Sequence, residues 1–153
     1  MSKEVSSSNK LKEITLSRRP LVRPERVRKY GGNITVVVAM DLKLGTFLFY
    51  RKKGSGWSFP WKFTKGNTIG THLAGEIVHN QTGVQTLRHK TEELPVDEKN
   101  GRHSYLKIRI IVIPIRKDLQ RTPKDCEIRY MSKDELSNEK ISQLCRKVIQ
   151  YIK

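Results

Sequence analysis

The chain has 153 residues and a mass of 17.8 kDa, a size typical of one domain with at most a short tail rather than of a multi-domain protein. Hydrophobic residues make up 36% of it and gather in runs, which is enough for a core of ordinary size without disulfide staples. Lysine and arginine number 31 against 15 acidic residues, a formal net charge of +16. Such a charge attracts polyanions, so the composition predicts nucleic acid as the partner.

Cysteine usage and hydropathy predict an intracellular protein. The two cysteines, Cys126 and Cys145, are too few for a disulfide framework or a four-thiolate zinc site, so we expect reduced thiols in the nucleus or the cytoplasm. No apolar run approaches the roughly 18 residues that a membrane span needs, and residues 1–10 lack the apolar stretch of a secretory signal. A mitochondrial location stays open, because the first residues contain Ser and Arg but also Glu4, Glu13 and Glu25.

Residues 1–32 are strongly basic and show no regular apolar pattern. Pro20 and Pro24 interrupt the segment, and Gly31-Gly32 marks the start of a folded domain over residues 33–153. We therefore expect residues 1–32 to be a flexible basic arm, either simply solvated or ordered by an RNA or DNA backbone. Its candidate contact residues are Arg18, Arg19, Arg23, Arg26, Arg28 and Lys29.

The first half of the domain predicts a β-hairpin followed by a helix. Residues 33–40 and 46–51 are apolar or β-branched runs on either side of a turn, and residues 55–63 predict a short strand that Pro60 interrupts. Residues 71–82 place Leu73, Ala74, Ile77 and Val78 on one helical face, and Gly83 ends this helix.

The second half predicts further strands and a final helix. The expected elements are strands over residues 84–90, 105–115 and 127–131, a polar loop over 92–103, a capped turn at Ser132, and an amphipathic helix over 138–152. Strands, helix, strands and helix in this order indicate an α+β or mixed-sheet α/β domain.

The segment from Gly56 to Val84 resembles the Nudix hydrolase family. Gly-Trp-Ser-Phe-Pro at residues 56–60, then a loop, then a helix that ends in Thr-Gly-Val at 82–84, is similar to the strand end and Nudix box of that family. The family's box is Gly-x5-Glu-x7-Arg-Glu-U-x-Glu-Glu-x-Gly-U, where U is a bulky aliphatic residue, and counting back from Gly83 needs no gap. The resemblance implies a Nudix-like fold over residues 33–153, a mixed β-sheet sandwiched between helices.

The charged positions of this box are not kept. Lys62 stands at the opening glycine, Thr68 at the first glutamate, Glu76-Ile77 at the Arg-Glu pair and Asn80-Gln81 at the Glu-Glu pair. Nudix enzymes bind Mg²⁺ or Mn²⁺ on box carboxylates, because hard cations need anionic oxygen ligands, whereas Asn80 and Gln81 carry neutral amides. The resemblance therefore implies no metal-dependent pyrophosphohydrolase activity and no bound cofactor.

Three helix residues form a remaining candidate metal site. His72, Glu76 and His79 are spaced to share one helix face, although a solvated face is the favoured interpretation and no fourth ligand is evident.

Alternating aromatic residues and lysines follow the hairpin. Trp57 and Phe59 predict burial, whereas Trp61 and Phe63 lie beside Lys62 and Lys65 and suit stacking on a base. The candidate nucleic-acid-binding residues of the domain are Arg51, Lys52, Lys53, Trp61, Lys62, Lys65, Asn80, Gln81, Lys107 and Arg109.

These observations predict a non-catalytic Nudix-like protein that binds RNA, as part of a ribonucleoprotein or ribosome-associated complex. The resemblance supports this prediction, because relatives without box carboxylates work in RNA processing and in ribosomes. One alternative is an altered hydrolase of nucleotide diphosphates or RNA 5′ ends, with metal ligands such as Glu76, Glu92, Glu93 or Asp97. Another is a protein-docking subunit of a nuclear, DNA-associated complex, and DNA stays open as the nucleic acid.

Overall fold

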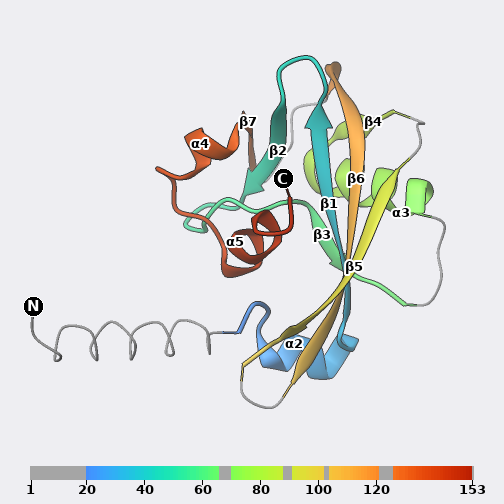
Figure 1. Cartoon of the computed structure of the whole chain (residues 1–153), viewed down its shortest axis with the longest axis vertical. Helices are drawn as coiled ribbons and strands as arrows, with labels where there is room; N and C mark the ends of the chain where they lie inside the picture. Colours follow the sequence, from blue (N-terminus) through green and yellow to red (C-terminus); the bar gives the residue numbers. More distant parts are fainter. Residues whose placement is uncertain (1–19, 66–69, 88–90, 102–103, 121–125, 153) are drawn as a thin grey trace, which may run out of the picture.

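A mixed β-sheet between helices forms the domain (Figure 1). The computed structural model describes residues 20–65, 70–87, 91–101, 104–120 and 126–152, with the backbone alone for 116–120. Within these ranges no helix is long and apolar enough to cross a membrane.

Seven strands make up the sheet. The path β4-β6-β1-β2-β7 runs through neighbouring strands, while β3 pairs with β1 and β5 pairs with β6. β1 and β6 are parallel and the other pairs are antiparallel, so the predicted mixed sheet is confirmed. The strand bounds are β1 (Asn33–Asp41), β2 (Thr46–Arg51), β3 (Trp61–Phe63), β4 (Val84–Thr86), β5 (Glu92–Lys99), β6 (Tyr105–Gln120) and β7 (Glu127–Met131).

Alternate side chains of the central strands supply two apolar cores. Ile34, Val36 and Val38 of β1 face one core, whereas Val37 and Ala39 face the other, as the period of two along a strand requires. The helix α3 (Gly70–Thr82) covers the second core, and the helices α4 (Lys133–Leu136) and α5 (Gln143–Ile149) cover the first.

The central helix agrees with the sequence pattern. Leu73, Ala74, Ile77 and Val78 are all buried on one face of α3. Gly83 ends the helix at φ +74°, a left-handed conformation that glycine adopts without steric cost. This glycine is therefore required by the backbone, which explains its place at the end of the box helix.

The last helix is shorter than predicted. Ser132 and Glu135 form the expected capping box of α4, but α5 begins only at Gln143. Residues 140–142 are extended instead, because the Trp57 N–H donates to the Lys140 carbonyl and the Ser142 N–H donates to the Trp57 carbonyl, both at 2.9 Å. A backbone already paired with another segment cannot also close helical hydrogen bonds.

The predicted loop over residues 92–103 is wrong for its first eight residues. β5 occupies them and pairs along its length with the first half of β6. Most of its side chains are exposed, and Pro95 lies within it, as proline is tolerated on an outer strand. The apolar alternation that identifies a strand is absent, because this strand forms through backbone pairing with β6 and not through burial.

The predicted arm is also wrong over residues 20–32. Pro24–Tyr30 form the helix α2, with proline at its start and Gly31 at its end, and Figure 1 shows α2 at the lower end of the sheet. Val22 is 4% exposed, and Leu21 and Val27 pack against the first core. A seven-residue helix is marginal alone, so these contacts hold it. The rest of the predicted arm, residues 1–19, lies outside the described residues.

Candidate nucleic-acid interface

A groove lies between α2 and β3, and we call it the α2–β3 groove. Its volume is about 290 Å³. α2 contributes two residues, β3 three, and the others come from β2, the turn after it and α3. The lining residues are Arg26, Tyr30, Tyr50, Lys52, Trp61, Lys62, Phe63 and Gln81, none of them acidic.

Aromatic rings form one side of the α2–β3 groove. Tyr30 of α2 stacks on Phe63 of β3 at 5.1 Å between ring centres, and Trp61 meets Phe63 edge to face at 5.3 Å. Trp61 and Phe63 are only half-buried and Tyr30 is 44% exposed, so part of each of these side chains is accessible from solvent. Such rings stabilise planar groups by stacking.

Arg26 lies among these rings. Its guanidinium carbon is 5.1 Å from the Phe63 centroid, 5.3 Å from Trp61 and 6.0 Å from Tyr30. These distances are within cation–π range, so the cation is oriented by the rings rather than by a carboxylate. In the described part of the chain, no ion pair involves Arg26, Lys52 or Lys62. The positive charge of the groove is therefore not neutralised by a described acidic side chain.

Tyr50 supplies a neutral hydroxyl. Burial, with a smaller contribution from Cys126, raises the pKa of Tyr50 to about 12, although the nearby Arg26 acts in the opposite direction. The phenol therefore stays protonated throughout the physiological range and remains a hydrogen-bond donor.

Gln81 holds the β3 wall of the groove. Its Oε1 accepts from the Trp61 N–H at 3.0 Å, and its Nε2 donates to the Trp61 carbonyl. The side-chain amide thus satisfies both backbone groups of one residue. A glutamate here, as in the Nudix box, would lack the donor for the Trp61 carbonyl.

Asn100 holds the α2 wall in the same way. Its Oδ1 accepts from the Val22 N–H and its Nδ2 donates to the Val22 carbonyl, both at 2.9 Å. Asn100 is 2% exposed, so these hydrogen bonds are shielded from water. One side-chain amide thus joins β3 to α3, and another joins the segment just before α2 to the turn after β5.

The residues at the box positions do not fit a magnesium site. Gln81 uses its amide on Trp61, Asn80 is exposed and uncharged, and Glu76 is the one carboxylate of α3. A Mg²⁺ ion prefers several anionic or carbonyl oxygens in octahedral geometry. Over the described ranges, no group of three His, Cys, Asp or Glu side chains gathers to hold a metal.

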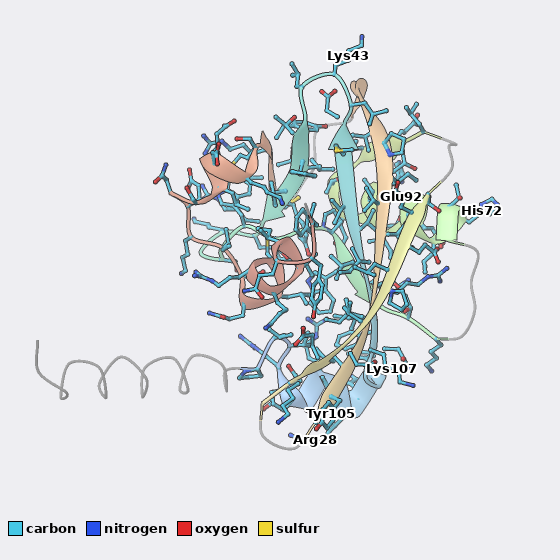
Figure 2. All side chains as sticks on the ribbon, in the orientation of Figure 1. Arg28, Lys43, His72, Glu92, Tyr105 and Lys107 are labelled. Carbon is cyan, nitrogen blue, oxygen red and sulfur yellow. The ribbon has the colours of Figure 1, made fainter. Side chains whose placement is uncertain are left out.

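The candidate trio on α3 is accordingly not a metal cluster. His72, Glu76 and His79 are all exposed, and Figure 2 shows His72 at the outer side of the helix. His72 and Glu76 border a separate depression of about 390 Å³, which His79 does not line.

The other predicted contact residues lie in several places. Arg51 pairs with Glu127 at 3.0 Å and stacks over Trp57, while Arg109 pairs with Glu93 at 2.7 Å. Lys107 and Arg109 line a second depression of about 490 Å³. It also contains carboxylates, so its charge is mixed.

The remaining predicted contact residues that the structure describes do not line the α2–β3 groove. Those that are exposed are Arg23, Arg28, Lys29, Lys53, Lys65 and Asn80, and Arg18 and Arg19 lie outside the described residues.

The structure thus brings Arg26, Lys52, Trp61, Lys62 and Gln81 together in one groove. Sequence reasoning missed Tyr30 and Tyr50 as members of it. For Tyr30 a signal existed, because Pro24 and Gly31 bracket a seven-residue segment with the punctuation of a short helix. For Tyr50 no local signal existed, since its position follows from the pairing of β2.

No protein-family model matches the sequence, and no curated protein matches it. Among solved structures, the Nudix hydrolase RenU from M. smegmatis matches with a TM-score of 0.54 and 13% identity, over 78% of this chain and 87% of that chain. The C-terminal domain of mouse MUTYH, solved in complex with human PCNA, matches with a TM-score of 0.55 and 15% identity, over 77% of this chain and 84% of that chain. A MutT structure from work on Aliivibrio salmonicida and Vibrio cholerae matches with a TM-score of 0.60 and 10% identity, over 78% of this chain and 94% of that chain.

Sequence identities of 10–15% support a similar fold and carry no argument about a shared function. The mixed sheet with flanking helices agrees with the resemblance drawn from the residues between Gly56 and Val84. The chain therefore has a Nudix-like fold.

Proposed function

We propose that this chain is a non-catalytic Nudix-like protein that binds RNA, as part of a ribonucleoprotein or ribosome-associated assembly. The observation that carries the proposal is that neutral amides, those of Asn80 and Gln81, stand where the Nudix box has a pair of glutamates. Gln81 holds a backbone segment where a box carboxylate is expected, and the described lining of the adjoining α2–β3 groove contains three cations and no acid.

Charge supports a polyanionic partner. The formal net charge of +16 favours association with phosphate backbones, and lysine and arginine contacts release counterions from them. RNA is favoured over duplex DNA, because the accessible rings of Tyr30, Trp61 and Phe63 suit bases that are not already stacked inside a duplex.

The test is fluorescence anisotropy of the full chain with labelled single-stranded RNA, duplex RNA and duplex DNA over a salt series. We expect micromolar or tighter binding of single-stranded RNA that keeps its preference at physiological salt. Weak binding that disappears equally for all three polymers would overturn the proposal and identify the charge as a general surface property.

A hydrolase is the second candidate, because two of the solved neighbours are a Nudix hydrolase and a MutT. Incubation of the chain with nucleoside diphosphates, nucleoside triphosphates and capped RNA in Mg²⁺ or Mn²⁺ separates the candidates. We expect no product. Release of nucleoside monophosphate that stops on chelation and in Glu76→Gln would establish the hydrolase instead.

Protein docking is the third candidate. The MUTYH domain was solved with PCNA, so a domain of this fold forms a complex with another protein in that case. If no nucleic acid binds, affinity capture with the purified chain becomes the next experiment.

A further inference from the structure

We propose that the α2–β3 groove binds one unstacked nucleotide of a single strand, with the base against Trp61 and Arg26 and the adjoining phosphate on the cations. The inference rests on the proposed function and specifies the ligand of one site. Its support comes from the rings, the cations, the size of the groove and the way its walls are held.

The position of Arg26 marks where a planar group fits. Its guanidinium lies within 5.1–6.0 Å of three ring centres, so this part of the groove already holds a flat, delocalised group next to aromatic side chains. Nucleobases stack on aromatic rings and on arginine guanidinium planes alike. A base that displaces the Arg26 guanidinium from the Trp61 ring takes over this stacking position, and the guanidinium can then stack on the other face of the base.

The phosphate has its own partners in the same groove. Lys52 and Lys62 approach from the turn after β2 and from β3, and Tyr50 adds a neutral hydroxyl donor. Hydrogen bonds from cations to phosphate oxygens are stronger than bonds between neutral groups. Since no described acidic residue lines the groove, no described carboxylate there repels the phosphate.

The size selects a single nucleotide. A groove of about 290 Å³ is at the lower end of small-molecule sites, which suits one base with its sugar and phosphate rather than a stacked pair. A base inside a duplex must first be flipped out at an energetic cost, so single strands are preferred.

The walls are fixed before any ligand arrives. Gln81 and Asn100 attach Trp61 and Val22 to the scaffold through paired hydrogen bonds. Less ordering is then needed on binding, which favours a defined site over a general basic surface.

The experiment uses the full chain and an eight-nucleotide single-stranded RNA with one central 2-aminopurine. Stacking quenches the fluorescence of this base, while anisotropy of an end label reports total binding. We expect saturable quenching, with loss of quenching and about tenfold weaker binding in Trp61→Leu. In Tyr30→Leu we expect reduced quenching and weaker binding, because Tyr30 is one of the three rings that position Arg26. Tyr30→Leu keeps the test valid if Trp61→Leu does not fold, since Tyr30 lies on the surface of α2.

Two matched controls are available. Tyr105 is an aromatic residue that is 65% exposed and does not line the groove, and Lys43 lies on the β1–β2 turn at the opposite end of the molecule (Figure 2). Tyr105→Leu and Lys43→Gln should retain the quenching and affinity of the wild type, whereas Lys62→Gln should weaken binding.

The outcomes separate this inference from the proposed function. RNA binding by anisotropy without quenching, or with folded Trp61→Leu and Tyr30→Leu equal to the wild type, overturns the nucleotide site but leaves RNA binding intact. Absence of RNA binding overturns both. Displacement of the RNA by a phosphotyrosine peptide but not by adenosine monophosphate would assign the groove to a protein partner and overturn the inference.

Discussion

The side chain of Gln81 binds both backbone groups of Trp61, twenty residues earlier in the chain. The Trp61 N–H requires an acceptor and the Trp61 carbonyl requires a donor, and a carboxamide is the side-chain group that offers both. A carboxylate at this position would place two acceptors against each other unless a cation or proton bridged them. Gln81, which the resemblance places at a glutamate of the Nudix box, thus makes a structural contact.

Gln81→Glu tests this contact. The substitution removes the donor to the Trp61 carbonyl and leaves that carbonyl in a part-buried site, so we expect the free energy of unfolding to fall by about 1–3 kcal/mol. Asn80→Asp, on the exposed surface of the same helix, is the control and should change it by less than about 0.5 kcal/mol. Urea unfolding measures both. Equal effects of the two substitutions would contradict the structural role of Gln81.

Asn100→Asp should weaken the α2–β3 groove from a distance. The aspartate keeps an acceptor for the Val22 N–H but cannot donate to the Val22 carbonyl, so we expect α2 to lose part of its attachment and RNA binding to fall severalfold. Asn138→Asp carries the same charge change at an exposed position and is the control. Protease susceptibility near residues 20–30 should rise in Asn100→Asp alone. Unaltered susceptibility and affinity would show that α2 does not depend on this clamp.

Residues 1–19 should contribute to affinity through charge alone. Replacement of their bases Lys3, Lys10, Lys12, Arg18 and Arg19 with glutamine removes five charges. For a single strand the slope of log K against log salt changes by about 0.7 per phosphate contact, so the slope should become shallower by at most about 3.5. Quenching of the 2-aminopurine RNA at saturation should persist. A lost quenching signal would mean that these residues form part of the groove.

Stability should decline at alkaline pH because of Cys145. Burial raises the pKa of this thiol from 9.0 to about 12, against smaller opposite effects of a backbone hydrogen bond from Phe59 and of Arg146. Below pH 9 the thiol is protonated in both states. Between pH 9 and 12 only the unfolded chain releases the proton, so the free energy of unfolding decreases as pH rises.

Urea titrations at pH 7, 9 and 10 measure this effect. Tyr50 and Tyr130, whose pKa values are also raised to about 12, add a similar dependence only above pH 10. Cys145→Ala should therefore flatten the decline between pH 9 and 10, whatever its effect at pH 7. Identical slopes for the wild type and the variant would rule out the thiol as the cause.

The sequence predicted the elements whose apolar side chains are buried at a regular spacing. It missed the elements that depend on backbone hydrogen bonds to a distant segment. α3 and β1 were identified because their apolar residues repeat with the periods of a helix and a strand. β5 carries exposed side chains along most of its length, and its conformation comes from hydrogen bonds to β6, which no local pattern reveals. The beginning of the last helix was misplaced for the same reason, since Trp57 pairs with the backbone of residues 140–142.

The candidate site was predicted in part. Lys62 and Gln81 were found from the spacing of the box, and Trp61 from its place among lysines. Arg26 was placed on a flexible arm, so its position among the rings was not foreseen. That position depends on Val22 and Asn100, which are 78 residues apart in the chain, and such long-range contacts leave no periodic signature.

The separation of 78 residues between Val22 and Asn100 determines when the α2–β3 groove can form during translation. On a chain made from its N-terminus, the segment with Arg26 leaves the ribosome long before Asn100 exists, and a helix of seven residues does not persist without its docking contacts. β1 can pair with β2 and β3 early, but its parallel neighbour β6 follows later. Until Asn100 has been translated, the nascent segment that contains Arg26 is an unfolded basic chain. The α2–β3 groove forms only after the turn that follows β5 has been translated. Binding through the groove is a property of the finished domain alone.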